Sequence, residues 1–268
     1  MIEITEALKE RLQDYNQELN RLYQTDMIDQ SQLKELISRE VGRFSSLTRL
    51  DEAKLKQWSA KDGVVGVDGS INRTGSSFPH YLTLMQALAQ SVTRREEGIT
   101  RQRVFSPLAE SDRSIIESYG QSEDVNPGEA ADKLTTSFLA KLEIKVAQAS
   151  IREWGPKLVM LDGSLMRYKT EAEADWKQLV DLALEQYVLL VGVIEEIGSY
   201  QLARQLASKL PAAMEKMYDR ELLFGLLEVG EKLTINRELD FKDQLIQTAF
   251  LRPAQAPGAQ TNTISQAM

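Results

Sequence analysis

The most informative residues of this chain are two aspartates, Asp68 and Asp162, each followed by Gly-Ser. Each ends an apolar run, VVGV at 64–67 and LVML at 158–161, that is typical of a strand buried on both faces. If the two strands are neighbours, their terminal carboxylates lie roughly 5 Å apart at one end of a sheet. Carboxylates this close repel each other, and a divalent cation relieves the repulsion and can activate a water. The pair therefore predicts a metal site suited to hydrolysis of a phosphodiester.

A third carboxylate usually completes such a site, and Glu143 is the candidate that we favour. It lies within residues 129–154, the clearest helical pattern of the chain, which ends just before the second apolar run. Glu153, Asp132 and Glu129 on the same helix are less favoured alternatives. The competing interpretation is structural, because Asp-Gly after a strand is a common turn signal and a helical glutamate often faces solvent.

The composition removes several other kinds of chemistry. The 268 residues include no Cys and one His, His80, which excludes disulfides, thiolate catalysis and metal sites built on Cys or several His. A metal would be held by oxygen, which favours Mg²⁺ or Mn²⁺. Ser70 and Ser164 lie in no G-x-S-x-G turn, so we expect them to cap turns. The net charge of −8 argues against broad coating of nucleic acid, but it is compatible with a nuclease that has a local basic groove.

Hydrophobic periodicity predicts the elements that would position these carboxylates. Apolar residues recur at three- and four-residue intervals over residues 2–23, and Asp29 can cap a second helix that ends near residue 41. This N-terminal helical pair either packs on its own domain or forms an arm for a dimer or another partner. Further helices are predicted at 111–119, 129–154, 172–187, 199–209 and 218–229, and strands at 64–67, 81–92, 101–105, 157–161, 188–194 and 242–251.

Three strands in succession, followed by alternating helices and apolar strands, predict an α/β fold with a mixed sheet flanked by helices. Residues 71–79, rich in Asn, Thr, Gly and Ser, predict a loop. We expect a helical arm at 1–45, a main domain at 60–253 and a disordered tail at 254–268. No apolar run is long enough to span a bilayer and residues 1–10 lack a signal-peptide pattern, which makes the cytoplasm the expected location.

Four segments resemble, in order, the NurA family of DNA-repair nucleases: VGVDGS at 65–70, KLVMLDGSLM at 157–166, LLVGVIEEIGSYQLA at 189–203 and DRELLFGLLEVGE at 219–231. The resemblance covers residues 64–253. It implies a ribonuclease H-like fold, DNA cleavage with Mn²⁺, and a role in DNA end resection as a homodimer working with a HerA-type helicase. By motif, Asp68 and Asp162 match the family's two metal-binding aspartates, and Glu143 matches its helical glutamate by position.

The chain departs from the family pattern at two places. Glu195 and Glu196 follow the third apolar strand, where the family commonly has a Lys. Family members usually continue past the FLRP segment at 250–253 into a region with a Tyr and a His, and residues 254–268 contain neither, so we expect a shortened member. The main hypotheses are a metal-dependent DNA nuclease and a weakly active or inactive NurA-like module that dimerises and binds a helicase. Another ribonuclease H-like nuclease is a third class.

Overall fold

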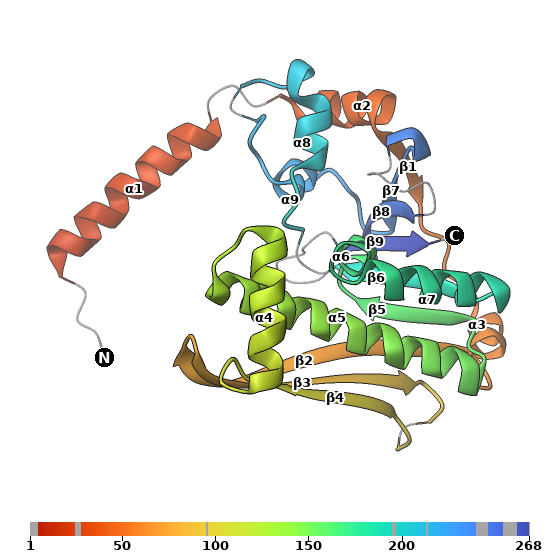
Figure 1. The fold of residues 1–268 in the computed structure, drawn as a ribbon. Coiled ribbons are helices and arrows are strands. Elements are labelled where there is room, and N and C mark those ends of the chain that lie inside the picture. The colour runs from red at the N-terminus through yellow and green to blue at the C-terminus, as the bar shows by residue number, and fades with distance from the viewer. Residues whose placement is uncertain are drawn as a thin grey trace. The chain divides into compact units, whose positions relative to one another are not determined.

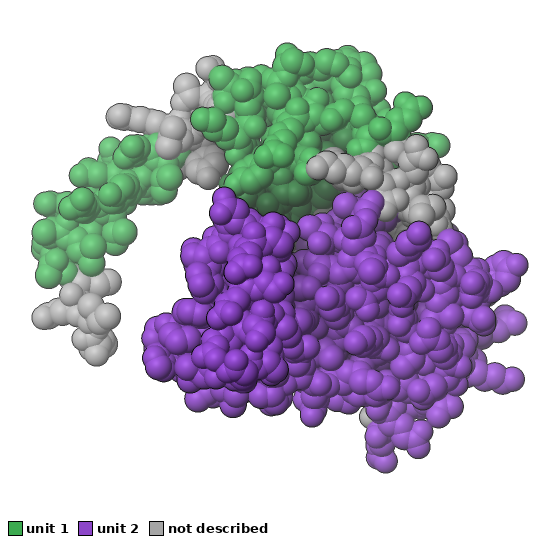
Figure 2. All heavy atoms as spheres, in the orientation of Figure 1, with its two compact units in different colours: residues 1–47, 195–239, 249–262 green, residues 48–194, 240–248, 263–268 purple. Residues whose placement is uncertain are grey.

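The computed structural model describes residues 5–24, 28–94, 96–194, 197–212, 214–239, 246–253 and 262–267. The chain forms two compact units, shown in different colours in Figure 2. Unit 1 contains residues 1–47, 195–239 and 249–262, and unit 2 contains residues 48–194, 240–248 and 263–268. The predicted domains are continuous in sequence, whereas each compact unit combines segments that are far apart in the chain.

Unit 2 is a mixed sheet with helices packed against it (Figure 1), which confirms the predicted α/β class. Its strands lie in the order β4-β3-β2-β5-β6-β9. β2, β3 and β4 are antiparallel, β2, β5 and β6 are parallel, and β9 is antiparallel to β6. The elements are α3 (Glu52–Ser59), β2 (Val64–Ser77), β3 (His80–Ser91), β4 (Ile99–Phe105), α4 (Glu110–Glu123), α5 (Pro127–Trp154), β5 (Leu158–Asp162), α6 (Leu165–Glu171), α7 (Glu173–Glu185), β6 (Leu189–Ile194) and, from residue 263, β9 (Asn262–Ala267).

Helix α5 supplies much of the core beneath the central strands. Asn126 caps its N-terminus by accepting a hydrogen bond from the backbone nitrogen of Glu129 (2.9 Å), and Gly155 ends it with a φ of 57°. Its buried side chains belong to one apolar cluster with Val65 and Val67 of β2. Burial of one such valine stabilises the fold by about 1.5–3 kcal/mol, so this contact holds β2 firmly against α5.

The strand that carries Asp68 is buried on one face only, so the prediction of burial on both faces is wrong. Val65 and Val67 are buried on the side of α5, whereas Gly66 and Asp68 are exposed on the opposite side. The apolar run hides this alternation because Gly66 contributes no side chain. The same exposed face also carries large apolar side chains, Leu82, Leu84 and Val104.

Residues 71–77 of the predicted loop continue the strand, so that prediction is wrong for them, and Asp68 lies inside a strand rather than at its end. β2 pairs with β3 as far as Thr74 and again at Ser77, and Phe78 and Pro79 form the turn. The backbone ladder supplies the hydrogen bonds of this hairpin. Its polar side chains are exposed on both faces, which is why the composition resembles that of a loop.

Unit 1 has its own apolar core and begins with the predicted helical pair. Asp29 caps α2, as predicted, by accepting a hydrogen bond from the backbone nitrogen of Ser31 (2.9 Å), and Leu33, Leu36 and Ile37 are buried. β1, β7 and β8 are neighbours and antiparallel. The elements are α1 (Glu6–Gln24), α2 (Gln30–Glu40), β1 (Gly42–Ser46), α8 (Gln201–Leu206), the 3₁₀ helix η1 (Ala207–Lys209), α9 (Asp219–Leu223), β7 (Glu231–Ile235), η2 (Arg237–Leu239) and, from residue 249, β8 (Ile246–Arg252).

Several boundaries in the C-terminal third differ from prediction. α9 ends at Leu223 instead of near residue 229, and β8 is described only from Ile246 onward. Of the predicted tail, residues 254–261 and 268 lie outside the described part, and so do Glu195 and Glu196. The remaining tail residues form strand β9 beside β6 instead of disordered chain. None of the described helices is both long enough and apolar enough to cross a membrane.

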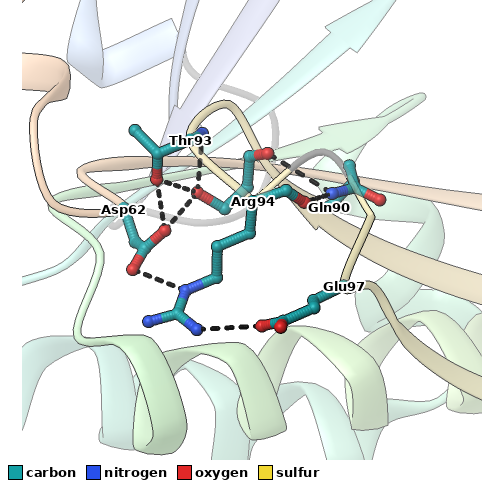
Figure 3. Close-up of polar contacts among 6 residues, drawn as sticks. Asp62, Gln90, Thr93, Arg94 and Glu97 are labelled. Carbon is teal, nitrogen blue, oxygen red and sulfur yellow. Dashed lines mark hydrogen bonds and ion pairs between the residues drawn. The ribbon is translucent and has the colours of Figure 1, made fainter.

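A buried carboxylate holds the start of β2 against the end of β3 (Figure 3). Asp62 is 8% exposed and accepts hydrogen bonds from the hydroxyls of Ser91 (2.7 Å) and Thr93. Its other oxygen accepts one from Arg94 Nε (2.8 Å), and the side chain of Gln90 donates to the Arg94 carbonyl. Burial alone would raise the pKa of Asp62, but the bonds from the two hydroxyls and the guanidinium outweigh it and lower the pKa to about 2.

Replacement of Asp62 by Asn tests this network, because Asn also tolerates the positive φ of 63° at this position. The folded pKa of about 2 lies below the ordinary 3.8, so ionised Asp62 stabilises the fold above pH ~4, and the contribution is lost as the pH falls through ~2. We expect Asp62→Asn to lower the free energy of unfolding by about 1–2 kcal/mol at neutral pH. The value is kept small because Arg94 is partly exposed, so solvent weakens its ion pair with Asp62. Urea unfolding of both proteins should show this difference shrinking between pH ~4 and ~3; a constant difference contradicts the assignment.

Candidate active site

Asp68 and Asp162 lie side by side on neighbouring parallel strands. β2 and β5 pair from Val64 with Leu158 to Val67 with Leu161, and each aspartate is the next residue of its strand. Adjacent strands are roughly 5 Å apart, which matches the spacing that the sequence suggested. Both side chains are exposed, and both residues line one cavity of about 360 Å³. Other lining residues include Leu88, Gln90, Met160 and Val193.

Glu143 approaches β2 from α5, on the face of the strand opposite the cavity, and is only 2% exposed. Its carboxylate packs against Gly69, the residue after Asp68: a Cβ atom on Gly69 would lie 2.3 Å from Glu143 Oε1. Glycine is therefore the residue that lets this carboxylate come so close to β2. The first Asp-Gly-Ser thus combines an acidic residue that faces the cavity with a glycine that admits a second acidic residue from behind the strand.

The three acidic side chains influence one another electrostatically. Burial raises the pKa of Glu143 to about 7, and it is the largest cause. The positive charge of Arg167 and the polar hydroxyl of Tyr168 lower this pKa, whereas the negative charges of Asp68 and Asp162 raise it. Near neutral pH Glu143 is therefore divided between its charged and neutral forms, and its charge depends on the cations nearby.

Two side chains beside these acids were not predicted, Arg167 and Tyr168, both on the short helix α6. Ser164 caps this helix, as expected, by accepting a hydrogen bond from the backbone nitrogen of Met166 (3.2 Å). Arg167 Nη2 donates to Glu143 Oε2. Buried Tyr168 donates to the backbone carbonyl of Asp162 (3.0 Å), and burial, followed by the charge of Glu143, raises its pKa. The sequence signal for both is their place in the first turns after the second Asp-Gly-Ser.

The alternative acids and the other serine lie elsewhere. Asp132 is exposed and pairs with Arg73 (3.1 Å), and Glu129 pairs with Lys133 (3.0 Å). Like Glu143, the three alternatives Asp132, Glu129 and Glu153 do not line the cavity of the two aspartates; Glu143 is distinguished by its contact with Gly69 beside Asp68. Ser70 lies within β2 instead of at a turn, and His80 is exposed at the start of β3.

The type of donor fits a hard divalent cation, because the cavity presents carboxylate oxygens from Asp68 and Asp162. The arrangement as it stands is incomplete: within the described stretches, no three His, Cys, Asp or Glu side chains form a group that could hold a metal ion. The third carboxylate, on Glu143, is occupied by Arg167. Asp68 and Asp162 would therefore be the first residues to hold a metal, and Glu143 would join them only if it exchanged its partner.

Solved structures with some likeness to this chain are endonuclease V proteins. The Ciona intestinalis enzyme, in complex with a 24mer DNA containing an inosine followed by a ribo-adenosine, is 13% identical with a TM-score of 0.29, over 96% of this chain and 83% of that one. The catalytic domain of human endonuclease V is 13% identical with a TM-score of 0.35, over 89% of this chain and 80% of that one. The Bacillus subtilis endonuclease V is 12% identical with a TM-score of 0.33, over 90% of this chain and 78% of that one. These scores are too low to carry an argument about fold or activity.

The comparison of sequences is more specific. No curated protein matches the chain significantly. The family model described as the NurA domain matches residues 62–260, nearly three quarters of the chain, and this range includes both Asp-Gly-Ser motifs, α5 and α6. The chain therefore belongs to the NurA domain family.

Proposed function

We propose that this protein is a metal-dependent DNA nuclease that uses Mn²⁺ or Mg²⁺ and acts in the cytoplasm in the end resection of DNA double-strand breaks. The observation that carries the proposal is the juxtaposition of Asp68 and Asp162 on adjacent parallel strands in one cavity. Membership of the NurA domain family supports it, because the resemblance of the two motifs implies DNA cleavage.

Each side chain has a distinct part in the proposed reaction. Asp68 and Asp162 would hold the divalent cation, which when bound would supply positive charge to a phosphodiester and lower the pKa of a water. Glu143 contributes a third oxygen donor from below the strand, or accepts a proton, since its pKa of about 7 lies near the working pH. Tyr168 fixes the backbone at Asp162 through its hydrogen bond to the carbonyl (3.0 Å). Gln90 and Met160 line the wall of the same cavity as the two aspartates.

The direct test is digestion of linear duplex and single-stranded DNA by the wild-type protein. We expect cleavage with Mn²⁺, weaker cleavage with Mg²⁺, and none after addition of a chelator, because carboxylates alone do not activate water for phosphodiester hydrolysis. Release of nucleotides is followed on labelled DNA, which separates exonuclease from endonuclease products. Cleavage that is unaffected by the chelator would contradict the proposal.

A second role is favoured by the surface of α1. Leu8, Leu12, Tyr15 and Leu19 recur on one face of this helix and are 44–55% exposed. A repeated apolar stripe of this kind is typical of a helix that packs on another chain. It supports the alternative that the protein is an interaction module, which forms a homodimer or binds a HerA-type helicase. Absence of cleavage in the digestion, together with self-association in size-exclusion chromatography, would favour this role over the first.

A further inference from the structure

One ion pair connects the two Asp-Gly-Ser motifs. At the first motif, the carboxylate of Glu143 packs against Gly69 so closely that a Cβ atom there would lie 2.3 Å from Oε1. At the second motif, the guanidinium of Arg167 lies near Gly163, where a Cβ atom would be at an ordinary van der Waals distance of 3.9 Å from Nη1. Arg167 Nη2 donates to Glu143 Oε2 and closes the bridge. The positive charge of this guanidinium is therefore placed on Glu143 and beside the turn that follows Asp162.

The two partners differ in their freedom to move. Glu143 is anchored, because its side chain is only 2% exposed on the long helix α5. Arg167 is 33% exposed on the short helix α6, and its other contacts are looser: Nε lies 4.0 Å from Glu171 Oε2, and the guanidinium lies 4.6 Å from the ring centre of Tyr168. Nε is buried and has no hydrogen-bond partner within the described residues. Arg167 can therefore withdraw toward solvent, whereas the buried Glu143 carboxylate must take up a proton or another cation when it does.

We propose that Arg167 is the internal counter-cation of Glu143 and competes with the divalent metal for this carboxylate. The inference rests on the proposed function, because it takes Asp68 and Asp162 as the primary metal ligands. Arg167 balances the buried charge while the cavity holds no metal. Metal binding displaces it, so part of the metal's binding free energy is spent on breaking the ion pair. Arg167 is thus a positioning residue that sets metal affinity and keeps Glu143 from closing the site prematurely.

The test is direct measurement of Mn²⁺ binding by calorimetry, with free Mn²⁺ followed by electron paramagnetic resonance, in the absence of DNA. Arg167→Gln removes the charge but keeps a hydrogen-bond donor for Glu143, and we expect it to bind Mn²⁺ on the order of tenfold more tightly. Arg103→Gln is the matched control, since Arg103 is 34% exposed and pairs with buried Asp112 (3.3 Å) away from the cavity. We expect its Mn²⁺ affinity to equal that of the wild type.

A second substitution separates competition from simple support of the fold. In Arg167→Gln combined with Glu143→Gln, the gain in affinity should disappear, because the carboxylate over which the cations compete is gone. Arg167→Lys, which keeps a charge without the planar fork, should bind Mn²⁺ with intermediate affinity and covers the case in which Arg167→Gln does not fold. Thermal melts confirm that each variant is folded.

The outcomes separate the inference from the proposed function. Unchanged or weaker Mn²⁺ binding by Arg167→Gln, in a protein that loses its Mn²⁺ on Asp68→Asn, overturns the inference and leaves the proposed function intact. Mn²⁺ binding that persists after both aspartates are replaced overturns the proposed function, whatever Arg167 does. Absence of Mn²⁺ binding to every variant overturns both.

Discussion

Asp162→Asn should lower Mn²⁺-dependent DNA cleavage at least ~100-fold, because even loss of a group that supports a metal ligand costs about 10- to 100-fold. Asp68→Asn should have a similar effect, since the two residues are adjacent on paired strands and line the same cavity. Asn has nearly the same shape, and both positions are exposed, so the fold should be retained. Initial rates on labelled duplex DNA measure the loss, and Mn²⁺ binding measured in parallel identifies its cause.

Asp181→Asn is the matched control for this experiment. Asp181 is an exposed aspartate on α7 that does not line the cavity, and its replacement removes the same charge from the same unit. We expect full cleavage by this variant and melting temperatures within a few degrees of wild type for all three single variants. Cleavage that survives the simultaneous replacement of Asp68 and Asp162 would show that the hydrolytic site lies elsewhere.

Gly192→Ala should destabilise the protein by about 1–3 kcal/mol and reduce cleavage as well. Gly192 lies on β6 directly beneath the turn after Asp162, where a Cβ atom would come within 2.5 Å of the Gly163 carbonyl oxygen and 3.0 Å of the Leu165 nitrogen. These are backbone atoms, and the turn is tied to β6 by a hydrogen bond from Gly163 N to the Val193 carbonyl (2.7 Å). The added methyl group must therefore push the turn that follows Asp162 away from β6.

Gly66→Ala provides the comparison for stability. Gly66 also lies within a strand of the same sheet, but nothing lies within 4 Å of the Cβ atom that alanine would add. We expect no loss of stability from this change, because alanine restricts the unfolded chain more than glycine does. Urea unfolding of the two variants measures the difference directly. Equal midpoints would mean that the contact at Gly192 relaxes without cost.

The sequence predicted the elements with strong periodicity and the two acids that they carry. Helix α5 is long enough for its apolar pattern to indicate a helix, whereas β5 is recognised as a strand because its apolar run is short and lies between Gly155-Pro156 and Gly163. The pairing of Asp68 with Asp162 was predictable because both follow apolar strands that could be neighbours. The hairpin that contains residues 71–77 was not, since its polar side chains are exposed on both faces and only its backbone bonds define it.

The surroundings of the acids were harder to predict. Helix α6 has only seven residues, too few for a recognisable apolar period, so the sequence gives no sign that Arg167 meets Glu143. That contact joins residues 24 positions apart and depends on how α5 and α6 pack. The open face of β2 was mispredicted because Gly66 reads as apolar in a sequence and contributes no side chain to either face.

The parallel register of β2 and β5 also limits how this protein can vary over evolutionary time. Side chains alternate between the two faces of a strand. A single-residue deletion between Leu158 and Leu161 would therefore turn Asp162 toward α5 and expose Leu161, which is buried in the core. Exchanges of one apolar residue for another in these segments preserve the geometry, whereas a one-residue change in their length inverts it. Homologous chains should therefore differ freely in side-chain identity along β2 and β5 and place their insertions in the connections outside them.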